Sequence, residues 1–154
     1  DSGARNALAV GLQLMLAPRW FVLYCGPKML SPRGRCFTFD SSADGFARGE
    51  GCGSIFMSSS QVQREQKNFE DTLALLAGSA ANQDGRSASM TAPHGPSQQQ
   101  CILTSLKEFE LTPNNMSMAE CHGTGTALGD PIEVSALRMV MQKRETPILN
   151  TSAK

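Results

Sequence analysis

A change of apolar spacing over residues 97–152 constrains the fold of this chain more than any other feature. From Ser97 the apolar residues fall at helical spacing, Met118 to Glu120 predicts a short strand, Asp130 to Met141 a second helix, and Ile148 to Ser152 a last strand. A helix that joins two strands in this way places them parallel in one sheet, so the pattern predicts a layered α/β fold. The side chains predicted to face the core are Ile102, Leu103, Leu106 and Phe109 on the first helix and Val134, Leu137, Val140 and Met141 on the second.

The first half of the chain predicts strands separated by longer loops. Ala7 to Leu16 is a nearly unbroken apolar run, which is typical of a strand buried on both faces. Gly53 to Met57 predicts a short strand, and Leu73 to Ala80 predicts another buried one.

Three segments predict loops. Prolines and glycines punctuate the stretch from Pro18 to Gly34, which indicates irregular structure. The glycine-dense segment from Phe37 to Gly51 indicates a well-ordered loop, and the charged segment from Ser58 to Asp71 a surface excursion.

Composition excludes several classes of function. The 154 residues form at most one domain. The 14 basic residues balance 14 acidic ones and form no basic block, which argues against binding to nucleic acid or to an anionic membrane. The five cysteines are dispersed without CxxC spacing, which argues against a disulfide framework and against a zinc site, and no metal ligands are predicted. No apolar run is long enough to cross a membrane as a helix.

The most specific motif is the run His-Gly-Thr-Gly-Thr at 122–126, followed by Gly-Asp-Pro-Ile-Glu at 129–133. A histidine in a glycine-relieved turn can donate to a developing oxyanion, or it can simply end a strand. The adjacent hydroxyls of Thr124 and Thr126 can bind a polar ligand or satisfy nearby backbone groups. Asp130 at the N-cap and Glu133 at N3 predict a capping box, with Pro131 at N1.

In these residues the chain resembles the β-ketoacyl synthase (ketosynthase) domain of type I polyketide synthases. The resemblance runs almost from end to end and rests on ordered blocks at 29–36, 43–53, 82–87, 91–98, 122–133 and 152–154. It implies the thiolase fold, whose layers follow the order α-β-α-β-α. Two alternatives remain. The chain could resemble the ketosynthase of an animal-type fatty-acid synthase, which fits these blocks better than bacterial fatty-acid condensing enzymes do. It could also be a non-elongating ketosynthase that only docks a carrier protein.

The resemblance also implies that residues 1–154 are a central-to-C-terminal part of such a domain. The family's nucleophilic cysteine would precede Asp1, and its second catalytic histidine would follow Lys154. None of the five cysteines lies in the nucleophile's motif. The isolated piece is therefore expected to be inactive, or to be no more than a truncated coding fragment.

The resemblance assigns roles to individual residues. His122 would be one of two histidines that stabilise the thioester oxygen during malonyl decarboxylation, and Thr124 and Thr126 would bind the phosphopantetheine arm. Lys154 would orient the second histidine, with Glu133 as its ion-pair partner. Alone, Lys154 would be an ordinary solvated lysine.

The implied reaction is a decarboxylative Claisen condensation catalysed by an acyltransferase. Its expected partners are an acyl carrier protein and malonyl and acyl thioesters, with no cofactor bound directly beyond the carrier's phosphopantetheine arm. The complete domain is expected to be a homodimer in the cytoplasm, with a plastid as the alternative compartment. His94, in a Pro-His-Gly-Pro turn, is predicted to be a surface residue, and Arg48 to hold a loop.

Overall fold

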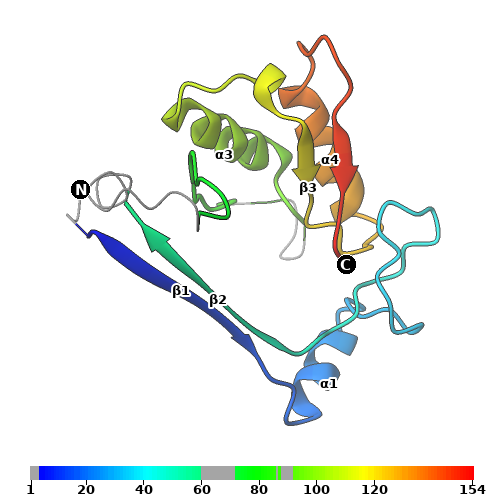
Figure 1. Cartoon of the computed structure of the whole chain (residues 1–154). Coiled ribbons are helices and arrows are strands. Elements are labelled where there is room, and N and C mark those ends of the chain that lie inside the picture. The colour runs from blue at the N-terminus through cyan, green and yellow to red at the C-terminus, as the bar shows by residue number, and fades with distance from the viewer. Residues whose placement is uncertain (1–3, 60–71, 86, 88–91) are drawn as a thin grey trace. The chain divides into compact units, whose positions relative to one another are not determined.

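The computed structural model describes residues 4–59, 72–85, 87 and 92–154, shown in colour in Figure 1. The chain divides into two compact units, one made of residues 1–20 and 49–75 and the other of residues 21–48 and 76–154. The predicted surface excursion at 58–71 lies almost wholly outside the described residues.

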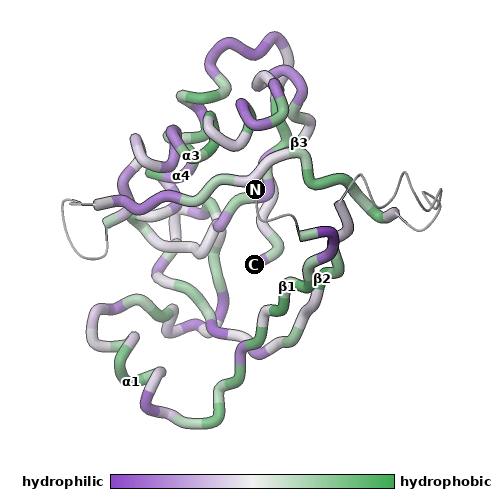
Figure 2. The backbone as a smooth tube through the Cα atoms, turned by 90° about the vertical axis from the view of Figure 1, so that its left-hand side faces the viewer, coloured by the Kyte–Doolittle hydropathy of each residue, from purple (hydrophilic) through white to green (hydrophobic). Residues whose placement is uncertain are grey.

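The first unit is built on an antiparallel pair of strands, β1 (Asn6–Gln13) and β2 (Gly51–Ser58). Their register runs from Asn6 opposite Ser58 to Gln13 opposite Gly51, and both strands are rich in hydrophobic residues (Figure 2). Both strands were predicted, but the burial of the first is wrong. Leu8, Val10 and Leu12 are 63–65% exposed, because a two-stranded ribbon by itself leaves its faces open.

A short helix, α1 (Arg19–Cys25), interrupts the stretch that was predicted to be irregular. It begins directly after Pro18, and in the second unit its aromatic residues meet the chain that returns at 46–48. The Arg48 guanidinium carbon lies 5.0 Å from the centre of the Phe21 ring and 5.3 Å from that of Tyr24, and Tyr24 meets Phe46 edge to face. These distant aromatic and cation–π contacts stabilise a helix of only seven residues, and local spacing does not reveal them.

The rest of the second unit follows the predicted order of helix, strand, helix and strand. Helix α3 (Gly95–Glu108) leads through a 3-10 turn, η1 (Pro113–Asn115), to β3 (Met118–Glu120). Helix α4 (Gly129–Val140) then leads to β4 (Leu149–Thr151), which pairs with β3 in parallel. Figure 1 shows α3 and α4 next to each other and the strands β3 and β4 side by side. The parallel pairing confirms the prediction from apolar spacing.

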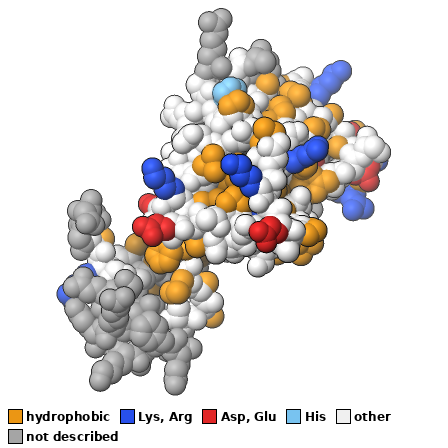
Figure 3. All heavy atoms as spheres, turned by 90° about the horizontal axis from the view of Figure 1, so that it is seen from above, with side chains coloured by type: hydrophobic (Ala, Val, Ile, Leu, Met, Phe, Trp, Pro, Cys, Tyr) orange, Lys and Arg blue, Asp and Glu red, His pale blue; other side chains and the backbone are white. Residues whose placement is uncertain are grey.

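The core of this unit lies between α3 and α4. Its buried apolar residues are Leu106, Ala136, Leu137 and Val140. Of the other predicted core residues, Ile102, Val134 and Met141 are half-buried. Leu103 and Phe109 are 46% and 65% exposed, so their predicted burial is wrong. Exposed hydrophobic side chains are also visible among the charged ones in Figure 3.

The segment predicted as a buried strand at 73–80 is not a strand in the structure, and Leu73 and Leu75 are exposed. Residues 76–80 run along α3, where Ser79 N donates to Glu108 Oε2 at 2.5 Å and the Cys101 thiol contacts Ala80 O. A strand requires a neighbouring strand to satisfy its backbone, and here side chains of α3 bind Ser79 N and Ala80 O instead.

Within the described ranges, every helix is too short or too polar to cross a lipid bilayer.

Candidate active site

The chain leaves β3 at Glu120 and enters the His-Gly-Thr-Gly-Thr turn. Gly123 and Gly125 adopt left-handed backbone angles, with φ of 49° and 73°. A Cβ atom at Gly123 would lie 2.6 Å from the Thr38 side chain, and one at Gly125 would lie 2.5 Å from Phe37 N. Both the turn and the close approach of the loop at 36–46 therefore require glycine, which confirms the predicted glycine-relieved turn.

Glu133 holds the first peptide of this turn. Its Oε1 accepts a hydrogen bond from His122 N at 2.6 Å and its Oε2 one from Gly123 N at 2.9 Å. These bonds are charge-assisted and engage both carboxylate oxygens, so they fix the backbone from which the imidazole projects.

Asp130 holds the other end of the turn and is only 5% exposed. Its Oδ1 accepts from Gly125 N at 3.1 Å and Thr126 N at 3.2 Å, and its Oδ2 accepts from Phe39 N at 2.9 Å. A buried carboxylate is tolerated when backbone donors replace its water shell, as these do.

The predicted capping box is therefore wrong. The helix begins at Gly129, and neither carboxylate caps it, because Asp130 binds amides of the preceding turn and loop and Glu133 binds those of His122 and Gly123. The backbone N–H groups of the turn lie within hydrogen-bonding distance of both carboxylates and donate to their oxygens. Thr126 serves the helix end instead, since its Oγ1 accepts from Gly129 N at 3.1 Å.

The His122 side chain is exposed, and its ring has no hydrogen-bond partner in the part of the chain that the structure describes. Its peptide is held on both sides. Glu133 binds its N–H, and its carbonyl accepts from Lys154 Nζ at 2.8 Å and Ser152 Oγ at 3.4 Å. The backbone of His122 is thus held by hydrogen bonds, whereas its ring is not held by any among the described residues.

Lys154 and Glu133 do not form the expected ion pair among the described residues. Lys154 instead reaches the His122 carbonyl, while both Glu133 oxygens are engaged by backbone amides. The two side chains meet at the same peptide from opposite ends, so the structure brings them together with His122 but not with each other.

The two threonines differ. The Thr126 hydroxyl already accepts from Gly129 N, which is ordinary turn chemistry, although its proton is still available for donation. Thr124 is half-buried, and its hydroxyl has no partner within the described ranges.

Cys121, which precedes the histidine, is poorly suited to act as a nucleophile. Burial, followed by the negative charges of Glu133 and Glu120, raises the pKa of its thiol above its ordinary value. A thiol with a raised pKa stays protonated near neutral pH and reacts slowly.

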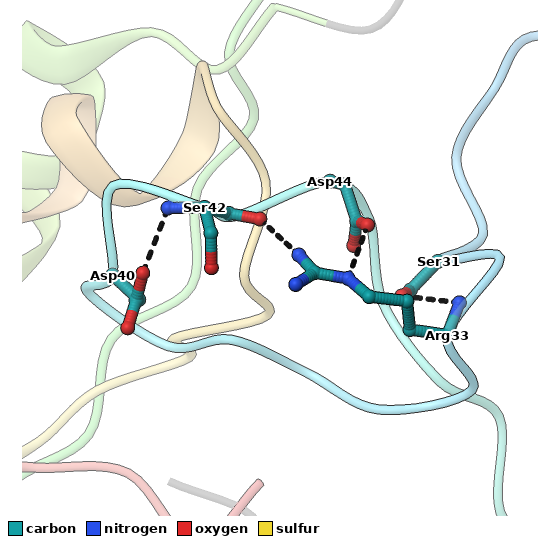
Figure 4. Close-up of polar contacts among 5 residues, drawn as sticks. All are labelled: Ser31, Arg33, Asp40, Ser42 and Asp44. Carbon is teal, nitrogen blue, oxygen red and sulfur yellow. Dashed lines mark hydrogen bonds and ion pairs between the residues drawn. The ribbon is translucent and has the colours of Figure 1, made fainter.

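The loop beside the turn is fastened by Arg33 (Figure 4). Its Nε lies 2.8 Å from Asp44 Oδ2, its guanidinium also donates to Ser42 O, and its guanidinium carbon lies 3.6 Å from the centre of the Phe37 ring. Ser42 N in turn donates to Asp40 Oδ1 at 2.7 Å, and this bond is the main cause of the lowered pKa of Asp40. The well-ordered loop predicted here is present.

A cavity of about 440 Å³ lies next to this loop and the turn. Its lining residues are Phe39, Asp40, Ser41, Ala43, Thr126, Ala127, Asp130, Pro131 and Val134. Phe39 has a left-handed backbone with φ of 57°, which costs a non-glycine residue about 1–2 kcal/mol. Sequence reasoning missed Phe39 and Thr38, whose hydroxyl donates to Gly123 O; the only signal was their place in the glycine-dense loop.

His94, the second histidine, precedes α3, and its Nδ1 lies 2.7 Å from Ser97 Oγ. It is half-buried at the start of the helix.

Two family models cover most of the chain. Residues 2–63 match the N-terminal domain of β-ketoacyl synthases, and residues 73–154 match the C-terminal domain. The chain therefore belongs to the β-ketoacyl synthase family.

The similar proteins define the kind of ketosynthase. One is a component of the phenolphthiocerol/phthiocerol polyketide synthase of Mycobacterium tuberculosis, to which the chain is 46% identical over 85% of its length, spanning 7% of that protein. Another component of the same synthase is 42% identical, again over 85% of this chain and 8% of the relative. The chain is thus a ketosynthase segment of the type I polyketide synthase kind.

Solved structures agree. The ketosynthase from module 6 of the Bacillus subtilis bacillaene synthase is 33% identical, with a TM-score of 0.88 over 97% of this chain and 27% of that one. The oxazolomycin ketosynthase domain of Streptomyces albus is 27% identical, with a TM-score of 0.90 over 97% and 26%. These likenesses confirm the predicted thiolase-like fold.

Proposed function

We propose that these residues form half of the catalytic centre of a ketosynthase that extends a polyketide by decarboxylative condensation. The proposal rests on one observation above all, the fixed peptide and free imidazole of His122. Glu133 and Lys154 bind the N–H and the carbonyl of His122, so the backbone from which the ring projects is already ordered.

In the proposed reaction, the carbon–carbon bond to the malonyl carboxylate breaks and CO₂ leaves with its carbon. The electron pair moves into the thioester, whose oxygen becomes an enolate. The His122 ring donates a hydrogen bond to this oxygen, and one well-placed donor in a dry site contributes about 3–4 kcal/mol to such a step.

The enolate carbon then attacks an acyl group held as a thioester on a cysteine. A new carbon–carbon bond forms, and the cysteine thiolate leaves. By family resemblance that cysteine and the second histidine belong to residues outside 1–154, so the isolated chain is proposed to be inactive.

The proposed partners are an acyl carrier protein and a second copy of the complete domain. Thr124 and Thr126 would hydrogen-bond the amides of the phosphopantetheine arm, and the unengaged Thr124 hydroxyl supports this role. A location in the cytoplasm or a plastid stays a prediction from sequence.

The test uses a complete ketosynthase domain that contains these residues. His122→Ala should lower the rate of malonyl decarboxylation about 100-fold or more while acyl loading of the nucleophile continues, because only the oxyanion donor is lost. Release of labelled CO₂ and mass spectrometry of the acyl-enzyme measure the two steps.

His94→Ala is the matched control, because it removes the other histidine and should leave both steps unchanged. Decarboxylation at the wild-type rate in His122→Ala would contradict the proposed role of His122. A wild-type domain that loads acyl groups but never condenses them would instead support the non-elongating alternative.

A further inference from the structure

Phe39 combines backbone strain with an uncovered aromatic ring. Its φ is 57°, and the other non-glycine residues with positive φ in the described ranges are Lys28 and Glu110. The side chain is nevertheless 41% exposed. A strained backbone that does not bury its side chain suggests that the ring is held in place for another reason.

The strain is maintained by contacts to the His122 turn. Asp130 accepts from Phe39 N with one oxygen and from Thr126 N with the other, at 2.9 and 3.2 Å. The adjacent Thr38 hydroxyl donates to Gly123 O. One buried carboxylate therefore ties Phe39 to Thr126 and fixes the loop to the turn.

Phe39 and Thr126 line the same cavity of about 440 Å³. Thr126 brings a hydroxyl, whereas Phe39, Pro131 and Val134 bring apolar surface. A pocket with these two kinds of wall suits a flexible ligand in which amides alternate with aliphatic segments. The phosphopantetheine arm has this chemistry.

We infer that Phe39 is a specificity-determining residue whose ring packs against the aliphatic part of the carrier arm, beside the Thr126 hydroxyl that takes an amide. This inference rests on the proposed function. It predicts that Phe39 matters for substrates that carry the whole arm and not for substrates that lack its distal half.

The experiment compares Phe39→Ala with the wild type in a complete ketosynthase domain. One substrate pair is bound to a carrier protein, and the other consists of the same acyl and malonyl groups on N-acetylcysteamine, which lacks the distal arm. Loss of the ring should raise KM for the carrier-bound malonyl group about tenfold and change kcat less than about twofold. KM for the short thioester should stay at the wild-type value.

Two further variants separate recognition from structure. Phe39→Tyr keeps the ring and should restore the wild-type KM. Glu110→Gly relieves a left-handed residue on another loop and should not change the preference between substrates. If Phe39→Ala folds poorly, Phe39→Leu serves in its place, with a smaller rise in KM.

Equal losses with both substrates would show that Phe39 only supports the protein structure, with the cavity filled by other residues of the domain, and would overturn the inference. An unchanged KM for carrier-bound malonyl groups would do the same. If the wild type condenses neither substrate, the proposed function fails and the inference fails with it. If the wild type condenses both, only the inference is at stake.

Discussion

The two carboxylate oxygens of Glu133 accept hydrogen bonds from the amides of His122 and Gly123. One carboxylate oxygen of Asp130 accepts from the amides of Gly125 and Thr126. The two acidic residues lie three positions apart near the start of α4, with Asp130 in its first turn, so they project from the same face of the helix. The start of α4 thus supplies the acceptors for four N–H groups of the turn and fixes the backbone from which the imidazole projects.

At the same scale, valine substitutions of Thr124 and Thr126 should lower the free energy of unfolding by different amounts. Thr126→Val removes the acceptor for Gly129 N and should lower the free energy of unfolding by about 1 kcal/mol. Thr124→Val removes no hydrogen bond and should cost less than about 0.5 kcal/mol. Both should raise KM for carrier-bound substrate if they bind the arm.

Urea unfolding of the complete domain measures this difference, with Thr126→Ser as the control that keeps the acceptor oxygen. Equal destabilisation by the two valine substitutions would contradict the assignment of the cap to Thr126.

At the scale of elements, Glu120 ties the end of β3 to the end of β4. It accepts from Ala153 N at 2.6 Å and from the Thr151 hydroxyl. The Thr151 hydrogen bond, followed by that of Ala153 and the charge of Lys154, lowers the pKa of Glu120 below its ordinary value of 4.5. The segment that brings Lys154 to His122 is therefore held by a charged acceptor.

This shift predicts a pH dependence with a definite sign. Because the folded pKa lies below the unfolded one, the stabilisation is present above pH 4.5 and is lost as the pH falls through the folded pKa. Glu120→Gln should lower stability at neutral pH and flatten its decline in acid. Chemical denaturation at several pH values measures both effects in the complete domain.

Glu145→Gln is the control, because Glu145 is exposed and its side chain makes no hydrogen bond among the described residues. A variant of Glu120 with the wild-type acid profile would show that the pair of strands does not depend on this carboxylate.

At the scale of the whole chain, little apolar surface is buried. Leu106, Ala136, Leu137 and Val140 form the buried apolar core of the described ranges. Meanwhile β1 and β2 expose residues such as Val10, Ile55 and Phe56, at 63–68%. Hydrophobic burial is the main term that offsets chain entropy, so this amount is small for 154 residues.

We therefore expect the isolated chain to lack a cooperative thermal transition and to bind a hydrophobic dye such as ANS. Differential scanning calorimetry and dye fluorescence measure this, with a complete ketosynthase domain as the control. A sharp melt of the 154-residue chain as a monomer would contradict the expectation.

Much of the fold was accessible from sequence, because helical spacing and strand runs are local properties. The spacing of α3 and α4 and the parallel pair of β3 and β4 were predicted. The burial of β1 and the conformation of 73–80 were not, because burial and strand pairing depend on neighbours that a pattern does not name.

The sequence by itself determined the order of elements, the glycine-relieved turn at His122 and membership of the ketosynthase family. Only the tertiary structure decided what Asp130 and Glu133 bind. The sequence predicted that both would cap the local helix and that Glu133 would also pair with Lys154. In the folded chain they bind amides of the His122 turn and of the loop at Phe39. The physical reason is that a carboxylate binds the unpaired N–H groups that folding brings nearest, and those groups come from separate segments of the chain.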